Sequence, residues 1–560
     1  MPPPSLPPSQ DAPSPRRARL VAACFLLVFT VLLCLIPKPE NDLFFELRIG
    51  ADILRTGHLP RFDTYSWTNF GTPWDVPEWL SFVLYALCFR VGGFWGTWLL
   101  MTGVVLAATG VVWGRLSRVL PLAWAFGLAC LMLLALSDFV QERPYVFTYL
   151  FLAGTLCIVT RSREKNDGTR GLWTLALLCV VWTNLHQGVL TLVGLLIGSA
   201  AGDIGAAIWA RAHAAASDGK LDTNSFPPRF HLQRARRMLS TALACALAVM
   251  VSPYGWRVYR NVFVTLRDRQ LMANVTEWRP ITVLPLPQMM PFLILLLLTA
   301  CAFALSRRRN LPDGVVLAVL VAQAIVHARG VPLFAIGAVV IGAPHLADLR
   351  HRLPARVGAA SPSRLRGVLL GGFAIVYAVT FGLATWVNLR RAMGPRGLGP
   401  EGIGEAVARV PDYPDAACAF TQAEGFPSHL RLLNNFEIGG FLMERLPQQP
   451  VFIDGRLDVC AGRTFDDNLV LSRAGGTPQW AALVQKYDLD CVLTTNAREA
   501  RAFGKDPQWQ LVYADPKQGH RPRCRILLRR RPQFAALIAR CLHDRAGSPQ
   551  PRFGRVVPGL

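Results

Sequence analysis

Residues 20–37 read LVAACFLLVFTVLLCLIP, and residues 38–80 continue as KPENDLFFELRIGADILRTGHLPRFDTYSWTNFGTPWDVPEWL. The first stretch is apolar and long enough to cross a bilayer. The second places carboxylates among aromatic residues, in a chain that is otherwise basic and apolar: Glu40, Asp42, Glu46, Asp52, Asp63, Asp75 and Glu78. We therefore expect a membrane span, retained in the mature chain, that leads directly into an acidic loop.

The composition indicates a membrane protein with many spans. Of the 560 residues 52% are hydrophobic and 17% charged, and the mean hydropathy is +0.32, which is too apolar for an ordinary soluble protein of this size. The formal charge of +23 is typical of nucleic-acid binders too. Here, however, the arginines form short clusters between apolar segments, where they orient membrane spans, so we expect no nucleic acid partner. Residues 1–19 are rich in Pro and Ser and are predicted to be a disordered cytoplasmic leader.

Apolar length and the position of arginines together predict the topology. Cytoplasmic loops collect Lys and Arg, so Arg16, Arg17 and Arg19 place the N-terminus inside. The run 78–91 is short and is interpreted as a helix at the membrane interface. The transmembrane domain, 20–390, then has about eleven helices, with the acidic loop 37–93 outside: 20–36, 94–113, 120–137, 145–160, 172–186, 188–209, 238–252, 290–306, 313–327, 331–347 and 366–387. Counting 78–91 as a twelfth crossing is the alternative.

This topology gathers ionisable residues on the outer face. Besides the acidic loop, that face receives Asp138, Glu142, Arg143, His186, Tyr254, Arg257, Glu277, Arg279, His327 and Arg329. Such groups at span ends are costly unless they face a cavity or a partner, so the collection suggests a functional site. For each residue alone, the ordinary completion of a helix at the interface is the better explanation.

The chain changes character after the last span. A linker, 391–415, leads to a predicted periplasmic α/β domain at 416–532, followed by a tail at 533–560 that we expect to be poorly ordered. Strands are predicted at PVFIDGR, CVLTTN, WQLVYAD and RCRILLRR, and helices at GGFLMERL, TPQWAALVQKY and AREARAF. Asp454 and Asp458 in FIDGRLD suit either turn formation or binding. One disulfide among the five cysteines of this part is possible, without an assignable pairing.

These motifs as a set resemble bacterial integral-membrane proteins of the GT-C glycosyltransferase superfamily. The resemblance covers most of residues 38–530 and rests on Glu40-x-Asp42, LRIGADILRTGHLPRFDTYSWT, G-x-P-W, EWL, RPYVFTYL, TNLHQG, SPYGW, TEWRP, ARGVPLFA and NNFEIGGFLMERLP…PVFIDGR. It implies an enzyme that moves a hexosyl or pentosyl group from a polyprenyl-phosphate donor to an unknown acceptor. The reaction would take place at the outer face of the inner membrane, in envelope polysaccharide or glycolipid biogenesis.

The resemblance also implies roles for the outer residues. Asp42 and Glu40 match the first catalytic carboxylate, a base or the holder of a divalent cation such as Mg or Mn, and Asp138 or Glu142 matches a second. Charge on the departing phosphate calls for cations, for which Arg143, His186, Arg279 and Arg329 are candidates. Glu78 of the EWL motif is a further candidate for binding substrate.

The sequence departs from the pattern of the family at two positions. Relatives commonly carry Asp where this chain has Glu40 and His where it has Glu46, which puts strict metal geometry in doubt. Glu46 also lies four residues from Asp42 on an expected helix, where two charges repel.

A non-catalytic scaffold or binding protein of envelope polysaccharide assembly is the main alternative to a glycosyltransferase. A transporter is less well supported, because the spans contain few charged residues apart from Asp203.

Overall fold

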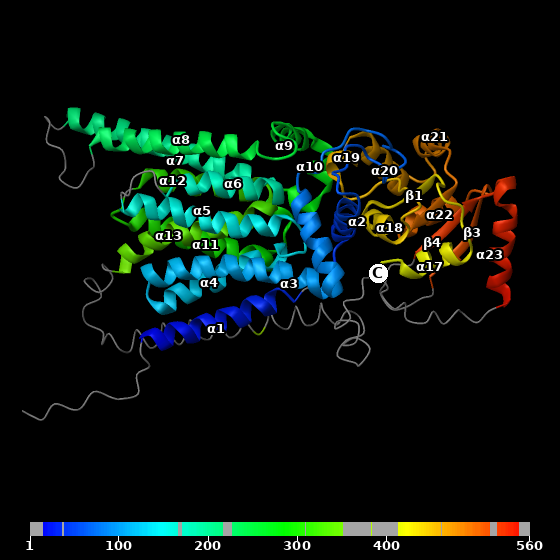
Figure 1. Ribbon diagram of the computed structural model, residues 1–560, viewed down its shortest axis with the longest axis horizontal. Helices are drawn as coiled ribbons and strands as arrows, with labels where there is room; N and C mark the ends of the chain where they lie inside the picture. The colour runs from blue at the N-terminus through cyan, green and yellow to red at the C-terminus, as the bar shows by residue number, and fades with distance from the viewer. Residues whose placement is uncertain are drawn as a thin grey trace, which may run out of the picture.

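The computed structural model describes residues 15–35, 39–165, 171–216, 227–308, 310–350, 413–460, 462–515 and 524–547, together with Gly382. A bundle of helices forms one part of the molecule and an α/β domain caps one of its ends (Figure 1). Six helices among the described residues are long and apolar enough to cross a membrane, so the protein is a multi-pass membrane protein. The end of the bundle that faces the α/β domain is called the domain end below.

The bundle consists of helices that follow one another along the chain, with short 3₁₀ segments between some of them. They are α1 (Pro15–Leu33), α3 (Trp79–Val119), α4 (Leu122–Leu136), η1 (Ser137–Phe139), α5 (Tyr145–Lys165), α6 (Trp173–Leu185), α7 (Val189–Ala216), α8 (Pro228–Val249), α11 (Leu286–Leu305), α12 (Leu311–Val326), η4 (Ala328–Gly330) and α13 (Val331–Arg350). Between α8 and α11 lie α9 (Arg257–Arg267), α10 (Arg269–Asn274), η2 (Thr276–Trp278) and η3 (Ile281–Val283). The predicted span 366–387 and most of the linker lie outside the described residues, so the number of eleven crossings stays a prediction.

The two ends of the bundle differ as the arginine clusters predicted. At the far end, the Arg115 guanidinium donates to Glu164 (Nη1–Oε2 2.8 Å) and that of Arg163 to Asp313 (Nη1–Oδ1 2.6 Å). At the domain end lie the segments expected on the outer face, around residues 138–144, 186–188, 276–279 and 327–330. Residues expected on opposite sides of a membrane are therefore separated in the fold.

Helix α3 contains a sharp bend at Gly92 and Gly93, whose backbone is not helical. Gly96 then lies against the preceding helix, because a Cβ there would be 2.0 Å from the Cys88 carbonyl oxygen. Residues 79–91 thus form a separate helix that packs at the domain end, where the Tyr85 hydroxyl donates to the Arg143 carbonyl (3.3 Å). This placement favours the interfacial interpretation of 78–91 over a twelfth crossing.

The acidic loop begins with α2 (Asn41–Thr56), which lies between the bundle and the α/β domain (Figure 1). It packs closely on both sides. A Cβ on Gly50 would be 2.2 Å from the Phe82 carbonyl oxygen of α3, and a Cβ on Gly440 of the domain would be 2.6 Å from the Asn41 carbonyl oxygen. Because these contacts are backbone to backbone, the position of Asp42 in the first turn of α2 is fixed by both parts of the protein.

The α/β domain is built on a four-stranded sheet in the order β1-β2-β4-β3. Its strands are β1 (Leu432–Asn434), β2 (Cys491–Thr494), β3 (Trp509–Ala514) and β4 (Arg525–Arg529); β1 is parallel to β2, and the other pairs are antiparallel. Its helices are α17 (Asp415–Ala423), α18 (Phe436–Arg445), α19 (Leu457–Cys460), α20 (Arg463–Arg473), α21 (Pro478–Tyr487), α22 (Ala497–Gly504), η6 (Pro532–Phe534) and α23 (Ala535–Gly547). The strands predicted at CVLTTN, WQLVYAD and RCRILLRR and the three predicted helices are confirmed.

Two expectations about this region are wrong, and one strand was not predicted. PVFIDGR is a buried loop with a single bridge, between Val451 and Ser66, since its backbone bonds with the acidic loop instead of a strand. Strand β1 was not foreseen. Residues 535–547 are helical and bury Leu537 and Cys541, so the domain extends past residue 532. All five of its cysteines are free thiols.

Candidate active site

The Arg143 side chain lies at the centre of three carboxylates from three separate segments. Its Nε is 2.6 Å from Glu40 Oε2, its Nη2 2.9 Å from Asp42 Oδ2 and its Nη1 3.3 Å from Glu277 Oε1. Glu40 and Asp42 begin α2, Arg143 precedes α5, and Glu277 is in η2. Residues more than 200 positions apart are thereby joined at the domain end of the bundle.

The three carboxylates around Arg143 differ in acidity. Burial raises the pKa of Glu40 to about 7, although Arg143 opposes the shift. Burial also raises the pKa of Asp42 against the same opposing charge. Burial acts in the same direction on Glu277, but Arg143 and Arg329 outweigh it and its pKa is lowered. Glu277 is therefore the carboxylate of the three whose ionised form is most favoured, whereas burial favours the protonated forms of Glu40 and Asp42.

Two cavities meet at this cluster. The first has a volume of about 440 Å³ and the second about 510 Å³, and Asp42, Arg143 and Glu277 line both. The first is also lined by Glu78, His186 and Arg329, and the second by Glu40 and Asp138. Asp42 therefore lies in the wall that the two cavities share.

His186 faces the first cavity as a neutral ring. Its Nδ1 accepts the backbone N–H of Gly188 (2.9 Å), so the proton is on Nε2, which lies 3.4 Å from Glu78 Oε1. Burial, with a smaller effect of Arg329, lowers the pKa of His186 to about 3, and burial raises that of Glu78 to about 7. The expectation that His186 supplies a cation is therefore wrong, because a buried ring near an arginine stays uncharged.

Arg329 is the predicted cation that remains available in the first cavity. It is held in η4, and its guanidinium carbon lies 4.1 Å from the centre of the Trp278 ring. Within the described parts of the chain, no carboxylate lies within 4 Å of its nitrogens. Stacking on an indole leaves the edge of a guanidinium free to bind an anion.

Two predicted residues do not join this site. Glu142 is 2% exposed and accepts a hydrogen bond from the Thr97 hydroxyl (2.6 Å), away from both cavities. Arg279 is exposed and lines neither cavity; its carbonyl accepts the Ala328 N–H (2.8 Å). Arg143 and Glu277 line both cavities, whereas Glu142 and Arg279 line neither. Asp138 lines the second cavity, as expected for its segment.

Sequence reasoning missed that the α/β domain completes the site. Gly455, Arg456, Leu457 and Asp458 line the first cavity, and a Cβ on Gly455 would be 2.2 Å from Asp42 Oδ1. The Trp74 indole N–H donates to Asp458 Oδ2 (2.8 Å). FIDGRLD was the available signal, but one sequence does not show which loop it meets.

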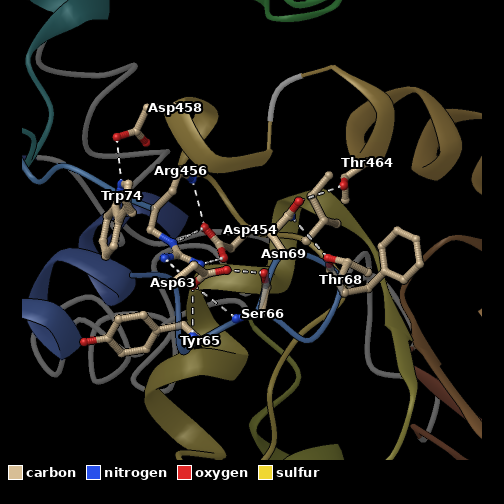
Figure 2. Close-up of polar contacts among 12 residues, drawn as sticks. Asp63, Tyr65, Ser66, Thr68, Asn69, Trp74, Asp454, Arg456, Asp458 and Thr464 are labelled. Atoms are coloured by element: carbon tan, nitrogen blue, oxygen red, sulfur yellow. Dashed lines mark hydrogen bonds and ion pairs between the residues drawn. The ribbon is translucent and has the colours of Figure 1, made fainter. Parts of the chain in front are cut away.

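A buried ion cluster holds this loop in place (Figure 2). Arg456 donates to Asp454 of its own loop (Nη2–Oδ2 2.6 Å) and to Asp63 of the acidic loop (Nη1–Oδ1 2.9 Å). The Ser66 hydroxyl also donates to Asp63, and the Arg456 guanidinium carbon lies 4.6 Å from the centre of the Trp74 ring. The side chains of Arg456 and Asp63 are 1% and 0% exposed. This buried cluster holds the acidic loop against the α/β domain and is called the joint below.

The carboxylates expected to hold a divalent cation do not fit that role as arranged. The Arg143 guanidinium occupies the space between Glu40, Asp42 and Glu277 where a cation would bind. No group of three or more His, Cys, Asp or Glu residues suited to a metal occurs in the described segments. Burial, and then Asp42, raises the pKa of Glu46 well above its usual value, which favours the protonated form and reduces the expected repulsion within α2.

No protein-family model matches the sequence, and no curated protein does so. The similar solved structures include the archaeal oligosaccharyltransferase AglB from Archaeoglobus fulgidus, in complex with an inhibitory peptide and a dolichol-phosphate, with 11% identity over 86% of this chain and 69% of that one and a TM-score of 0.49. They also include ArnT from Cupriavidus metallidurans bound to undecaprenyl phosphate, with 12% identity, 94% and 99% coverage and a TM-score of 0.46. The arabinofuranosyltransferase AftD from mycobacteria has 14% identity, 92% and 42% coverage and a TM-score of 0.45. At such scores, substrate and activity have to come from the geometry of the site.

Proposed function

We propose that this protein is a membrane glycosyltransferase that moves a hexosyl or pentosyl group from a polyprenyl-phosphate donor to a hydroxyl acceptor. The observation that carries the proposal is the position of Asp42 in the wall shared by two cavities. Transfer between two substrates requires both to reach one reactive centre, and a carboxylate placed between two cavities meets that requirement.

Asp42 acts as the general base in this proposal. Its Oδ2 is held by Arg143 Nη2 at 2.9 Å, and burial raises its pKa. Both features suit a base that takes a proton and keeps a fixed orientation. Asp42 removes the proton of the acceptor hydroxyl, and the acceptor oxygen forms a bond to the anomeric carbon of the sugar. The bond from that carbon to the phosphate oxygen breaks, and the polyprenyl phosphate leaves with the electron pair.

Arg329 stabilises the departing phosphate. It lies in the first cavity with its guanidinium unpaired by the described carboxylates and stacked on Trp278. Negative charge grows on the phosphate oxygen as the bond breaks, and a pre-positioned guanidinium stabilises that charge without reorganisation. The first cavity is accordingly the donor cavity, and the second cavity accommodates the acceptor.

We infer the sidedness from the arginine pattern. The N-terminus is cytoplasmic, the α/β domain is periplasmic, and the reaction takes place at the outer face of a bacterial inner membrane, in envelope polysaccharide or glycolipid biogenesis. All the segments that bear the candidate residues lie at the domain end of the bundle, which agrees with one catalytic face.

The test is direct transfer by the purified full-length protein in lipid nanodiscs. It is incubated with a panel of polyprenyl-phosphate sugars and a membrane lipid and polysaccharide extract, and products are identified by mass spectrometry. Transfer or slow hydrolysis of a donor sugar by the wild-type protein, but not by Asp42→Asn, supports the proposal. If no donor is consumed by the wild-type protein, the scaffold function becomes the better explanation.

A further inference from the structure

Some charged groups of the donor cavity are paired with oppositely charged side chains of the protein, and others are available to bind a ligand. Arg143 is held by Glu40, Asp42 and Glu277. Arg456 is held by Asp454 and Asp63 with almost no exposure. A guanidinium already surrounded by carboxylates offers little net charge to a substrate. These two arginines therefore shape the cavity without attracting an anion into it.

Besides the buried Glu46, three charged groups among the described lining residues have no charged partner within 4 Å: the cation Arg329, the carboxylate Asp458 and the carboxylate Glu78, which contacts the neutral His186 ring and the Gln187 N–H. Glu78 lies within electrostatic range of both other groups. Asp458 is exposed to the cavity although protein surrounds it. Apart from the Trp74 N–H on Oδ2, its carboxylate is directed to no charged side chain within 4 Å among the described residues. Burial raises the pKa of Asp458 to about 6, so it is ionised at pH 7.5.

One cation and two carboxylates fit a ligand with a single anionic end. The phosphate of the donor matches Arg329, and the remainder of the donor then meets Glu78 and Asp458. Ionised carboxylates only accept hydrogen bonds. They therefore suit hydroxyl or amine groups, whereas a second negative charge beside them is repelled.

We infer that the donor cavity selects a sugar without negative charge, and that Asp458 of the α/β domain is a residue that determines this specificity. Asp458 accepts hydrogen bonds from donor sugar hydroxyls and repels a carboxylate-bearing sugar such as a hexuronic acid. The inference rests on the proposed function and deepens it by naming the class of sugar. It also gives the α/β domain a direct part in substrate recognition.

The experiment compares two donors that differ at one carbon, a polyprenyl-phosphate hexose and the corresponding hexuronic acid, at pH 7.5. We expect the wild-type kcat/KM to be roughly 100-fold higher for the hexose, the size of effect that a like-charge contact gives. Asp458→Asn keeps the size of the side chain and an oxygen acceptor for the Trp74 N–H. It should reduce the ratio of the two kcat/KM values at least about tenfold, by improving use of the hexuronic acid donor. Asp415→Asn, an exposed position of the same domain whose carboxylate pairs with Arg445, is the matched control and should keep the wild-type ratio.

Binding is measured separately, as the increase in Tm that each donor gives. This keeps the inference distinguishable from the proposed function. Stabilisation by the hexose donor but not by the hexuronic acid donor supports the inference even if neither is transferred, an outcome that would remove the transferase. Equal use or equal binding of the two donors by the wild-type protein overturns it. An unchanged ratio in Asp458→Asn, with a normal Tm, overturns it as well.

Discussion

Gly455 lies against Asp42 so closely that a Cβ at position 455 would be 2.2 Å from Asp42 Oδ1. A separation of that size is impossible for real atoms, so any side chain there has to displace either the loop or the carboxylate. The contact joins the first turn of α2 to the α/β domain across more than 400 positions of the chain. Glycine at 455 is therefore a requirement of the site.

Gly455→Ala should lower transferase activity strongly while the protein still folds. The methyl group moves the Asp42 carboxylate out of its position beside Arg143, and a displacement of about 1 Å is enough to cost roughly 100-fold in rate. Activity and Tm are measured together. Gly504→Ala is the control, because a Cβ there meets only Leu527 Cδ2 at 4.0 Å; equal losses in the two variants would show that the contact with Asp42 is unimportant.

Asp42→Asn should reduce turnover about 100-fold or more, the scale of a general base. The amide keeps the shape but cannot take the proton. Glu40→Gln should have the smaller effect, since Glu40 lines the second cavity but not the first, and its carboxylate pairs with Nε of Arg143. Turnover is measured at saturating donor. Normal turnover in both variants and in the double variant would exclude carboxylate chemistry at this place.

Arg329→Ala should raise KM for the donor and also lower kcat, because a phosphate contact is made in the ground state and strengthens as charge develops. Arg329→Lys should recover part of the loss by restoring the charge without the fork of donors. Arg279→Ala is the matched control, an exposed arginine nearby that lines neither cavity. A larger defect in Arg279→Ala than in Arg329→Ala would reverse the assignment.

Asp63→Ala should destabilise the protein by about 1–3 kcal/mol, because it leaves the buried Arg456 Nη1 and the Ser66 hydroxyl without their hydrogen-bond acceptor. The loss is read from denaturant unfolding of the α/β domain, followed by tryptophan fluorescence. Arg431→Ala gives the comparison. The side chains of Arg431 and its partner Asp488 are 52% and 47% exposed. Surface ion pairs of this kind contribute less than about 1 kcal/mol to stability. Similar losses of stability in the two variants would mean that the buried joint contributes no more to stability than a surface ion pair.

The stability of the protein should depend on pH through Glu78. Burial raises its pKa from 4.5 to about 7 in the folded state, so the folded protein binds more protons than the unfolded one between these values. The contribution to stability is then complete below pH 4.5 and is lost as the pH rises through 7. Glu78→Gln removes this dependence. The difference in Tm between pH 5 and pH 8 should be smaller in the variant than in the wild type; an equal or larger difference would contradict the buried position of Glu78.

The sequence predicted the bundle well because membrane spans and arginine clusters are local signals. The α/β domain was also predictable in outline, since strands such as CVLTTN are short buried runs. What could not be predicted is which side chains face each other at the ends of the spans. Glu142 and Arg143 are adjacent, yet one is buried against Thr97 and the other centres the site. Likewise, the pairing of Arg456 with Asp63 depends on how two distant loops pack, which no periodicity encodes.

The joint between the acidic loop and residues 454–458 has a consequence for how the protein is made. Its two halves, Asp63 and Arg456, are 393 positions apart, so the ribosome releases one long before it synthesises the other. During insertion of the helices, Asp42 lacks its Gly455 cover and Asp63 lacks Arg456. The arrangement of Asp42, Gly455, Asp63 and Arg456 can therefore form only after residues 454–458 have been synthesised. A chain that ends before these residues lacks the part of the first cavity wall formed by Gly455, Arg456, Leu457 and Asp458.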